Sequence, residues 1–211
     1  YNLQKADAGV REEGLLTARL YLSGDEVNAP EAKARALASL TSGLASRPGV
    51  LRTAVTTAIP ADDGGPTTML VKDVGAPPQE EIPATLVGAS DGLFETMGTA
   101  LFRGRDFTRA EVEDPASESV MVSASLATSI GGGDVVGRSI AIRSGRTHQW
   151  RTIIGVAPDI QYEEFGEETR AARRAIYVPY ARLGSRTVAV MARTSGPSAP
   201  LVAELRPLAK A

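Results

Sequence analysis

The chain has 211 residues and a formal net charge of −2 at pH 7, so its overall charge gives no reason to expect nucleic acid as a partner. Aromatic residues make up 5% of the sequence, which argues against a surface on which bases stack. The sequence has no cysteine, which excludes disulfides, thiolate zinc sites and cysteine nucleophiles. No apolar run reaches the roughly 18–20 residues that a membrane-spanning helix needs.

The first part of the chain predicts a strand, a helix and a second strand. Apolar and polar residues alternate over 15–22, as in a half-buried strand. A helix is expected over 28–47 with its leucines on one face, and Pro48 and Gly49 stop it. A run of β-branched residues over 50–57 predicts the next strand. This order is that of a βαβ unit, with room for another strand between its two strands.

One unbroken run, residues 90–108, predicts a short capped helix, a glycine stop, a brief apolar strand and a tight basic turn. Ser90 or Asp91 is expected to cap the helix, because either side chain can accept a hydrogen bond from a free backbone N–H. Gly98 is expected to stop the helix and Gly104 to mark the turn. Nothing in the run is chemically reactive.

The rest of the chain is rich in expected strands, and a helix is expected to follow Ser195 or Ser198. The strands are predicted over 67–74, 82–87, 120–123, 139–143, 150–156, 175–178 and 187–193. A strand and a helix near each end, with strands between them, predict an α+β fold of two lobes. We expect residues 1–88 plus 184–211 to form a terminal βαβ-type lobe and residues 89–183 to form an inserted, strand-rich lobe.

Polar motifs in the sequence give no candidate catalytic, cofactor or metal site. His148 is the only histidine, and we expect it in a surface turn without an orienting partner or a nucleophile. Residues 131–134 (Gly-Gly-Gly-Asp) lack the lysine of a phosphate-binding loop, and 62–65 (Asp-Asp-Gly-Gly) lack the ligand pattern of a calcium loop. Both are interpreted as turns. We therefore predict no catalytic residue, no bound cofactor and no metal.

A charged loop is expected over residues 163–174, and two aromatic residues lie at its start. Its acidic and basic side chains indicate a solvated face. Tyr162 and Phe165 leave two interpretations open, since they either fold back on the core or project toward a partner. They are the candidate partner contacts of the chain.

Segments along nearly the whole chain resemble, in the same order, the extracytoplasmic (periplasmic) core domain of MacB/FtsX-like ABC transporter permeases. Each motif is short, and their joint order is the specific feature. The segments are residues 7–10, 15–19, 47–50, 90–108, 123–127, 136–140, 150–160 and 176–181.

The resemblance implies a domain inserted after the first membrane helix of a four-helix permease, with a porter-like and a sabre-like lobe. It implies a place on the extracytoplasmic side of the cell membrane. The implied partners are the transmembrane helices of the same permease, a cytoplasmic ABC ATPase and a second permease copy or homologous half. A membrane-fusion adaptor is a partner in part of the family, and nucleic acid is not a partner.

The function that the resemblance implies is mechanical. The domain would be non-catalytic, any ATPase activity would reside in a separate cytoplasmic subunit or domain, and ATP-driven motion of the membrane helices would be coupled to export, extraction or partner docking. The alternative is a free-standing extracytoplasmic module that binds a ligand or a partner, with a pocket between its lobes.

Overall fold

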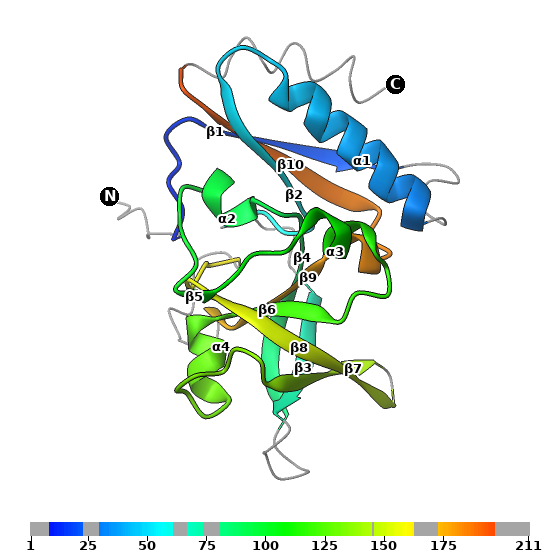
Figure 1. Cartoon of the computed structure of the whole chain (residues 1–211), viewed down its shortest axis with the longest axis vertical. Helices are drawn as coiled ribbons and strands as arrows, with labels where there is room; N and C mark the ends of the chain where they lie inside the picture. The colour runs from blue at the N-terminus through cyan, green and yellow to red at the C-terminus, as the bar shows by residue number, and fades with distance from the viewer. Residues whose placement is uncertain are drawn as a thin grey trace, which may run out of the picture.

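The computed structural model describes residues 9–22, 30–60, 67–73, 81–144, 146–162 and 173–196, with the backbone alone at 30 and 67–73. The fold is α+β, as predicted, with few helices and one large mixed sheet (Figure 1). The helical elements are α1 (Pro30–Ala45), α2 (Leu93–Thr96), α3 (Arg109–Glu113), α4 (Ala124–Ser129) and the 3₁₀ turn η3 (Tyr180–Arg182). The strands are β1 (Leu15–Tyr21), β2 (Val50–Thr56), β3 (Thr67–Asp73), β4 (Ile82–Ala89), β5 (Arg103–Gly104), β6 (Ser119–Ser123), β7 (Ser139–Ser144), β8 (Thr147–Ala157), β9 (Ala175–Pro179) and β10 (Thr187–Thr194).

Three strands and helix α1 form one end of the molecule, which we call the terminal sheet. Strand β10 lies between β1 and β2 and is antiparallel to both, with Leu15 opposite Arg193 and Ala54 opposite Met191. Helix α1 packs on β2, because Leu37 and Leu44 point inward and are buried. The unit β1-α1-β2 is therefore a βαβ unit split by another strand, as the sequence indicates.

The remaining long strands close on themselves and form what we call the barrel. The ring runs β4-β3-β7-β8-β6-β9 and returns to β4 through parallel pairing of β4 with β9. The short β5 pairs with β8 on the outside. Closure leaves none of these six strands as a free edge, which removes the liability of unpaired backbone groups.

Alternate residues of the barrel strands point to two different sides. Ile176 and Val178 of β9 belong to a cluster inside the barrel, and Ala175 and Tyr177 belong to a second cluster outside it. Helix α4 closes one end of the barrel with Leu126 and Ala127. Because side chains alternate along a strand, one set fills the barrel and the other faces its surroundings.

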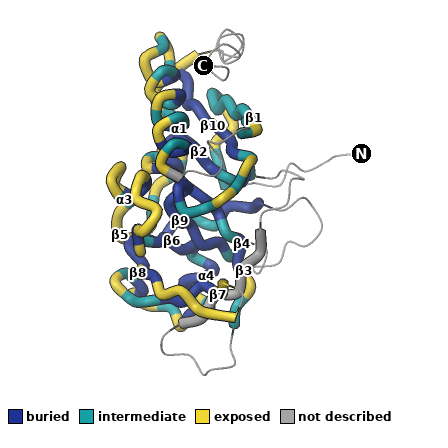
Figure 2. The backbone as a smooth tube through the Cα atoms, turned by 90° about the vertical axis from the view of Figure 1, so that its right-hand side faces the viewer, coloured by how far each residue is buried: buried dark blue, intermediate teal, exposed yellow. Residues whose placement is uncertain are grey.

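The outside cluster joins the barrel to the terminal sheet. It contains barrel residues such as Val87 and Tyr177 together with Leu37 of α1 and Val190 of β10. Figure 2 shows the resulting buried centre, where β9 and β6 run through the middle of the molecule and β10 lies above them beside α1. The two regions therefore share one continuous hydrophobic core.

The predicted lobe boundaries at residues 88 and 184 stay a prediction. Strands β3 and β4, which the prediction assigns to the terminal lobe, pair with β7 and β9 of the barrel. A boundary near residue 60 would follow this pairing more closely. The helix expected after Ser195 or Ser198 lies outside the described residues.

Candidate functional site

Helix α2 lies at the junction between the terminal sheet and the barrel, and its cap differs from the prediction. Neither Ser90 nor Asp91 caps it, because the N-cap position is Gly92, with φ of 70°. The Ser90 hydroxyl instead accepts a hydrogen bond from the N–H of Val55 at 2.9 Å. The N–H of Gly92 donates to Oδ2 of Asp106 at 3.0 Å. Ser90, one of the two expected cap residues, thus connects β2 to the segment that leads into this helix.

The apolar face of α2 links the two regions directly. Leu93, Phe94 and Met97 are buried, as their spacing predicts. The ring of Phe94 packs edge-on against Tyr177 of β9, with ring centroids 5.0 Å apart and an interplanar angle of 78°. Such an arrangement is favoured for aromatic pairs. Gly98 ends this short helix with φ of 76°, as expected.

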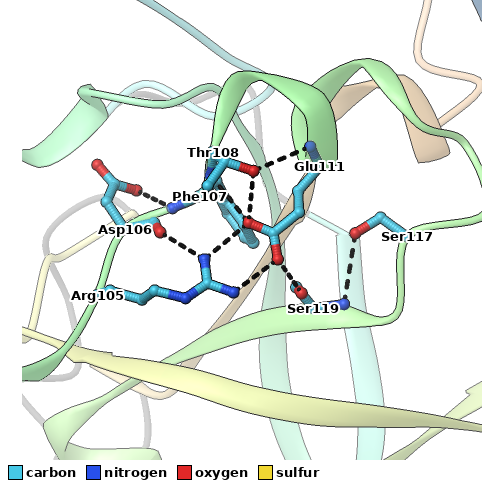
Figure 3. A network of polar contacts seen from close by, with 7 residues as sticks. All are labelled: Arg105, Asp106, Phe107, Thr108, Glu111, Ser117 and Ser119. Carbon is cyan, nitrogen blue, oxygen red and sulfur yellow. Dashed lines mark hydrogen bonds and ion pairs between the residues drawn. The ribbon is translucent and has the colours of Figure 1, made fainter.

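A polar network centred on Glu111 fixes α3 against the barrel (Figure 3). Arg105 donates to both carboxylate oxygens of Glu111, at 2.7 and 2.8 Å. Thr108 and Glu111 form a capping box, in which each side chain accepts from the backbone N–H of the other residue. The Ser119 hydroxyl of β6 donates to the same carboxylate at 2.5 Å.

Two carboxyl groups at the junction, those of Glu111 and Asp106, have pKa values shifted from their ordinary values. The hydrogen bonds from Arg105, and then those from Ser119 and Thr108, hold the pKa of Glu111 far below its ordinary value. Burial raises the pKa of Asp106, although the N–H groups of Phe107 and Gly92 act against that shift. Glu111 is thus a firmly ionised anchor.

Two cations, the buried Lys33 and the partly exposed Arg182, hold chain segments that connect the two regions. The Lys33 side chain of α1 is buried, and its Nζ donates to the carbonyls of Leu183 and Ser185 at 2.9 and 2.8 Å. Burial lowers its pKa. Arg182 donates to the carbonyls of Pro115 and Ser117, which follow α3. These bonds order the segment between η3 and β10 on one side and the segment after α3 on the other.

A groove runs between α1 and α3. Its inner part is a cavity of about 160 Å³ that Thr41, Ser90 and Tyr180 help to line. A wider outer part has a volume of about 600 Å³. Both parts share Ala38, Ser42, Arg109 and Glu113. Arg109 and Glu113 pair with each other at 2.8 Å. Glu31, Arg35 and Asp91 are further charged residues that line the groove.

His148 lies in strand β8 and not in a turn, which corrects its predicted position. Its Nε2 is 2.9 Å from Oε1 of Glu81, and Arg143 donates to the other oxygen of Glu81 at 2.9 Å. The hairpin of β7 and β8 places Arg143 opposite His148, and Glu81, which directly precedes β4, contacts both side chains. This exposed group is a surface ion-pair cluster without a nucleophile.

The structure corrects the surface interpretation of Tyr162. The residue is 1% exposed, and its hydroxyl donates to that of Tyr177 at 3.4 Å. Burial raises the pKa of Tyr162, so the phenol stays neutral. Tyr162 is therefore a core residue, which is the other of the two interpretations. Phe165 lies outside the described residues, so its role as a partner contact stays a prediction.

The glycine motif of residues 131–134 is a turn, as interpreted. Gly131, Gly132 and Gly133 all have positive φ, between 63° and 101°. The carbonyl of Gly133 accepts a hydrogen bond from Arg103 at 3.2 Å. The expected turn at residues 62–65 and the acidic residues from 163 to 168 fall outside the described part of the chain.

Helix α3 is absent from the sequence-based expectations, although the signal for it is present. Thr108 and Glu111 have the spacing of a capping box, and Val112 supplies the buried apolar residue. A capping-box search over residues 108–113 would have found it. The buried cations carry no comparable signal, because their partners are backbone carbonyls.

Where the structure describes the chain, no cluster of three or more acidic, histidine or cysteine side chains could hold a metal ion. The same part of the chain contains no helix with the length and apolar character to cross a membrane.

The comparisons with known proteins decide the family. A profile of the MacB-like periplasmic core domain matches residues 15–208. The chain belongs to this family. The membership confirms the resemblance read from the sequence and makes the chain a periplasmic-type domain of a MacB-like ABC transporter permease. A search of the curated proteins finds no match.

Solved structures support the fold of this MacB-like domain. The periplasmic region of MacB from Actinobacillus actinomycetemcomitans is 16% identical, with a TM-score of 0.61 over 98% of this chain and 87% of that chain. The extracellular domain of the noncanonic ABC-type transporter YknZ from Gram-positive bacteria is 18% identical, with a TM-score of 0.53 over 90% of this chain and 88% of that chain. At these identities the likeness concerns the fold.

Proposed function

We propose that this MacB-like domain is a non-catalytic, extracytoplasmic lever that carries ATP-driven motion of the membrane helices to export, extraction or partner docking. The observation that carries the proposal is the continuous hydrophobic core across the junction, which includes Tyr177 of the barrel and Val190 of the terminal sheet. Packed cores resist gradual deformation, so a displacement of one region moves the other.

The ends of the described domain support this role. β1 begins beside the end of β10, and the N–H of Thr194 donates to the carbonyl of Gly14 at 2.8 Å. Two membrane helices that continue from these neighbouring strands would act on one sheet. The partners in this proposal are those helices, a cytoplasmic ABC ATPase and a second permease copy, with an adaptor in some systems. The domain itself works without a cofactor.

The alternative is a module that binds a ligand or partner in a cleft, and the groove between α1 and α3 is its candidate place. Most residues that line the groove are polar or charged, unlike the mainly apolar lining of a small-molecule pocket, and Arg109 pairs with Glu113. The lever needs this groove to keep its width during transport, whereas a binding cleft needs it to open and close.

Cross-linking across the groove separates the two functions. Ser42→Cys and Glu113→Cys place thiols on α1 and α3 in a chain that has no cysteine of its own. In the full-length permease with its ATPase, a short bifunctional maleimide should leave ATP-dependent transport unchanged. Each single-cysteine variant treated with the same reagent is the control. Loss of transport in the cross-linked double variant alone would favour the binding cleft.

A further inference from the structure

Arg193 is a buried arginine near the end of β10, and its hydrogen-bond partners in the described part of the chain are backbone carbonyls. It is 9% exposed, and its guanidinium donates to three backbone carbonyls. Nε donates to Thr96 at the end of α2, Nη1 to Glu13 and Nη2 to Arg11. The rigid fork of a guanidinium suits several acceptors at fixed angles, which an ammonium group does not.

These acceptors belong to two segments that are distant in sequence. Arg11 and Glu13 lie on the stretch that leads into β1, and Thr96 lies at the end of α2. The same two segments also contact each other, since the N–H of Arg11 donates to the carbonyl of Met97 at 2.9 Å. The Arg193 side chain of β10 thus joins the segment before β1, which we call the entry segment (residues 11–13), to helix α2.

Gly98 gives independent support, because its missing side chain makes room for Arg193. A Cβ at this position would lie 3.0 Å from Nη2 of Arg193 and 2.8 Å from Cβ of Arg11. Its φ of 76° also disfavours other residues. Gly98 therefore has two roles: it ends α2, and it leaves the space that the Arg193 guanidinium occupies.

From α2 the contacts continue into the barrel. Phe94 of α2 packs on Tyr177 of β9, and both side chains are buried. We propose that Arg193 is a latch that fixes the entry segment (residues 11–13) and α2 to the exit strand β10, so that a pull on either end of the domain reaches the barrel through α2. The mechanical part of this inference rests on the proposed lever function. The latch itself is a property of the isolated chain and is tested there.

Arg52 supplies a matched control. It lies directly opposite Arg193 on the neighbouring strand β2. It also reaches α2, through an ion pair of 3.1 Å between its Nε and Oε2 of Glu95. Its side chain is 62% exposed, so the bond is expected to contribute little. The two arginines therefore differ mainly in burial and in the nature of their acceptors.

Amide hydrogen exchange of the 211-residue chain tests the latch with the variants Arg193→Lys, Arg193→Met and Arg52→Met. Arg193→Lys should raise exchange about tenfold or more at the amides of Arg11, Leu15 and residues 96–99, because buried carbonyls lose charged donors. Arg193→Met should raise it further. Exchange in β7 and β8 should stay within about twofold of the wild type, as should every segment in Arg52→Met.

Two results would overturn the latch. One is wild-type exchange at Arg11 and residues 96–99 in Arg193→Lys. The other is an equal rise across the barrel in that variant, which would make Arg193 a general contributor to stability. If Arg193→Met does not fold, the lysine variant alone decides. The exchange experiment measures no transport, so a result against the latch would leave the lever function open. A cross-linking result against the lever would likewise leave the latch intact.

Discussion

The barrel and the terminal sheet are held together by different means. The barrel is a closed ring whose interior is filled by apolar side chains, among them Val120, Ile140 and Ile153. The terminal sheet has three strands, and buried Lys33 and Arg193 bind backbone carbonyls at its borders. A packed apolar core resists gradual deformation, and hydrogen bonds add directional contacts at defined positions. In the proposed lever, the closed barrel moves as one body, and the hydrogen bonds at the borders of the terminal sheet set how this body is attached.

The largest expected effect concerns the shared core between the two regions. Phe94→Ala should lower the free energy of unfolding by about 3–5 kcal/mol, because it leaves a cavity beside Tyr177. Both regions should unfold in one transition, since they share this core. Chemical denaturation followed by far-ultraviolet circular dichroism and by Trp150 fluorescence measures this. Phe102→Ala is the control, because Phe102 is 63% exposed and should cost less than about 0.5 kcal/mol. Two separate transitions would show independent regions.

The Glu111 network should have the next largest effect, and this effect should depend on pH. Glu111→Gln loses the charged bonds from Arg105 and should lower stability by about 1–3 kcal/mol near neutral pH. The folded-state pKa of Glu111 lies below its ordinary value of 4.5, so the unfolded state takes up the proton first as the pH falls. The wild type should therefore lose its advantage over the variant below about pH 4.5. Urea denaturation at a series of pH values measures the difference. A difference that stays constant into acid would contradict the assignment.

Lys33 should have a smaller effect, with a pH dependence of the same sign that lies in the alkaline range. Lys33→Met removes two bonds to carbonyls but also removes a buried charge, so a net loss of about 1–2 kcal/mol is expected at neutral pH. Burial lowers the pKa of Lys33 below its ordinary value of 10.5. Between these two pKa values the unfolded state binds the proton more tightly, so wild-type stability should rise relative to the variant as the pH increases. Thermal unfolding from about pH 8 to 10 reads this trend. A falling difference would argue against a buried, charged Lys33.

The smallest effect should come from the exposed ion pair of Arg52 with Glu95. Arg52→Met should change stability by less than about 0.5 kcal/mol, and added salt should remove that change. Denaturation at low and high salt measures it. A loss above 1 kcal/mol (on the order of a buried bond) would mean that surface charge, and not the buried cations, attaches α2.

The sequence predicted the terminal sheet well because its signals are local. Alternation gave β1, leucine spacing gave α1, and another strand between β1 and β2 was foreseen. Barrel closure was not foreseen, since it depends on Thr85 pairing beside Ala175, far apart in the chain. No local pattern specifies which distant strands become neighbours.

The site was less predictable than the fold for a related reason. The N–H of Gly92 donates to the side chain of Asp106, which lies 14 residues further along the chain, and Arg193 binds carbonyls that every residue possesses. Tyr162 could not be assigned from its charged surroundings, because the chain turns it inward onto Tyr177. Only α3 had a local signal that could have been used, in the spacing of Thr108 and Glu111.

The central claim, that the two regions move as one body, is tested most directly by distance measurement in the working transporter. Ser39→Cys on α1 and Thr128→Cys on α4 place spin labels at exposed positions of the terminal sheet region and the barrel end, in a chain without cysteine. Electron–electron resonance on the full-length permease should give the same Ser39–Thr128 distance distribution with and without ATP. The distance between Thr128 labels on two permease copies should change. A shift of the Ser39–Thr128 distance on ATP binding would contradict the rigid lever.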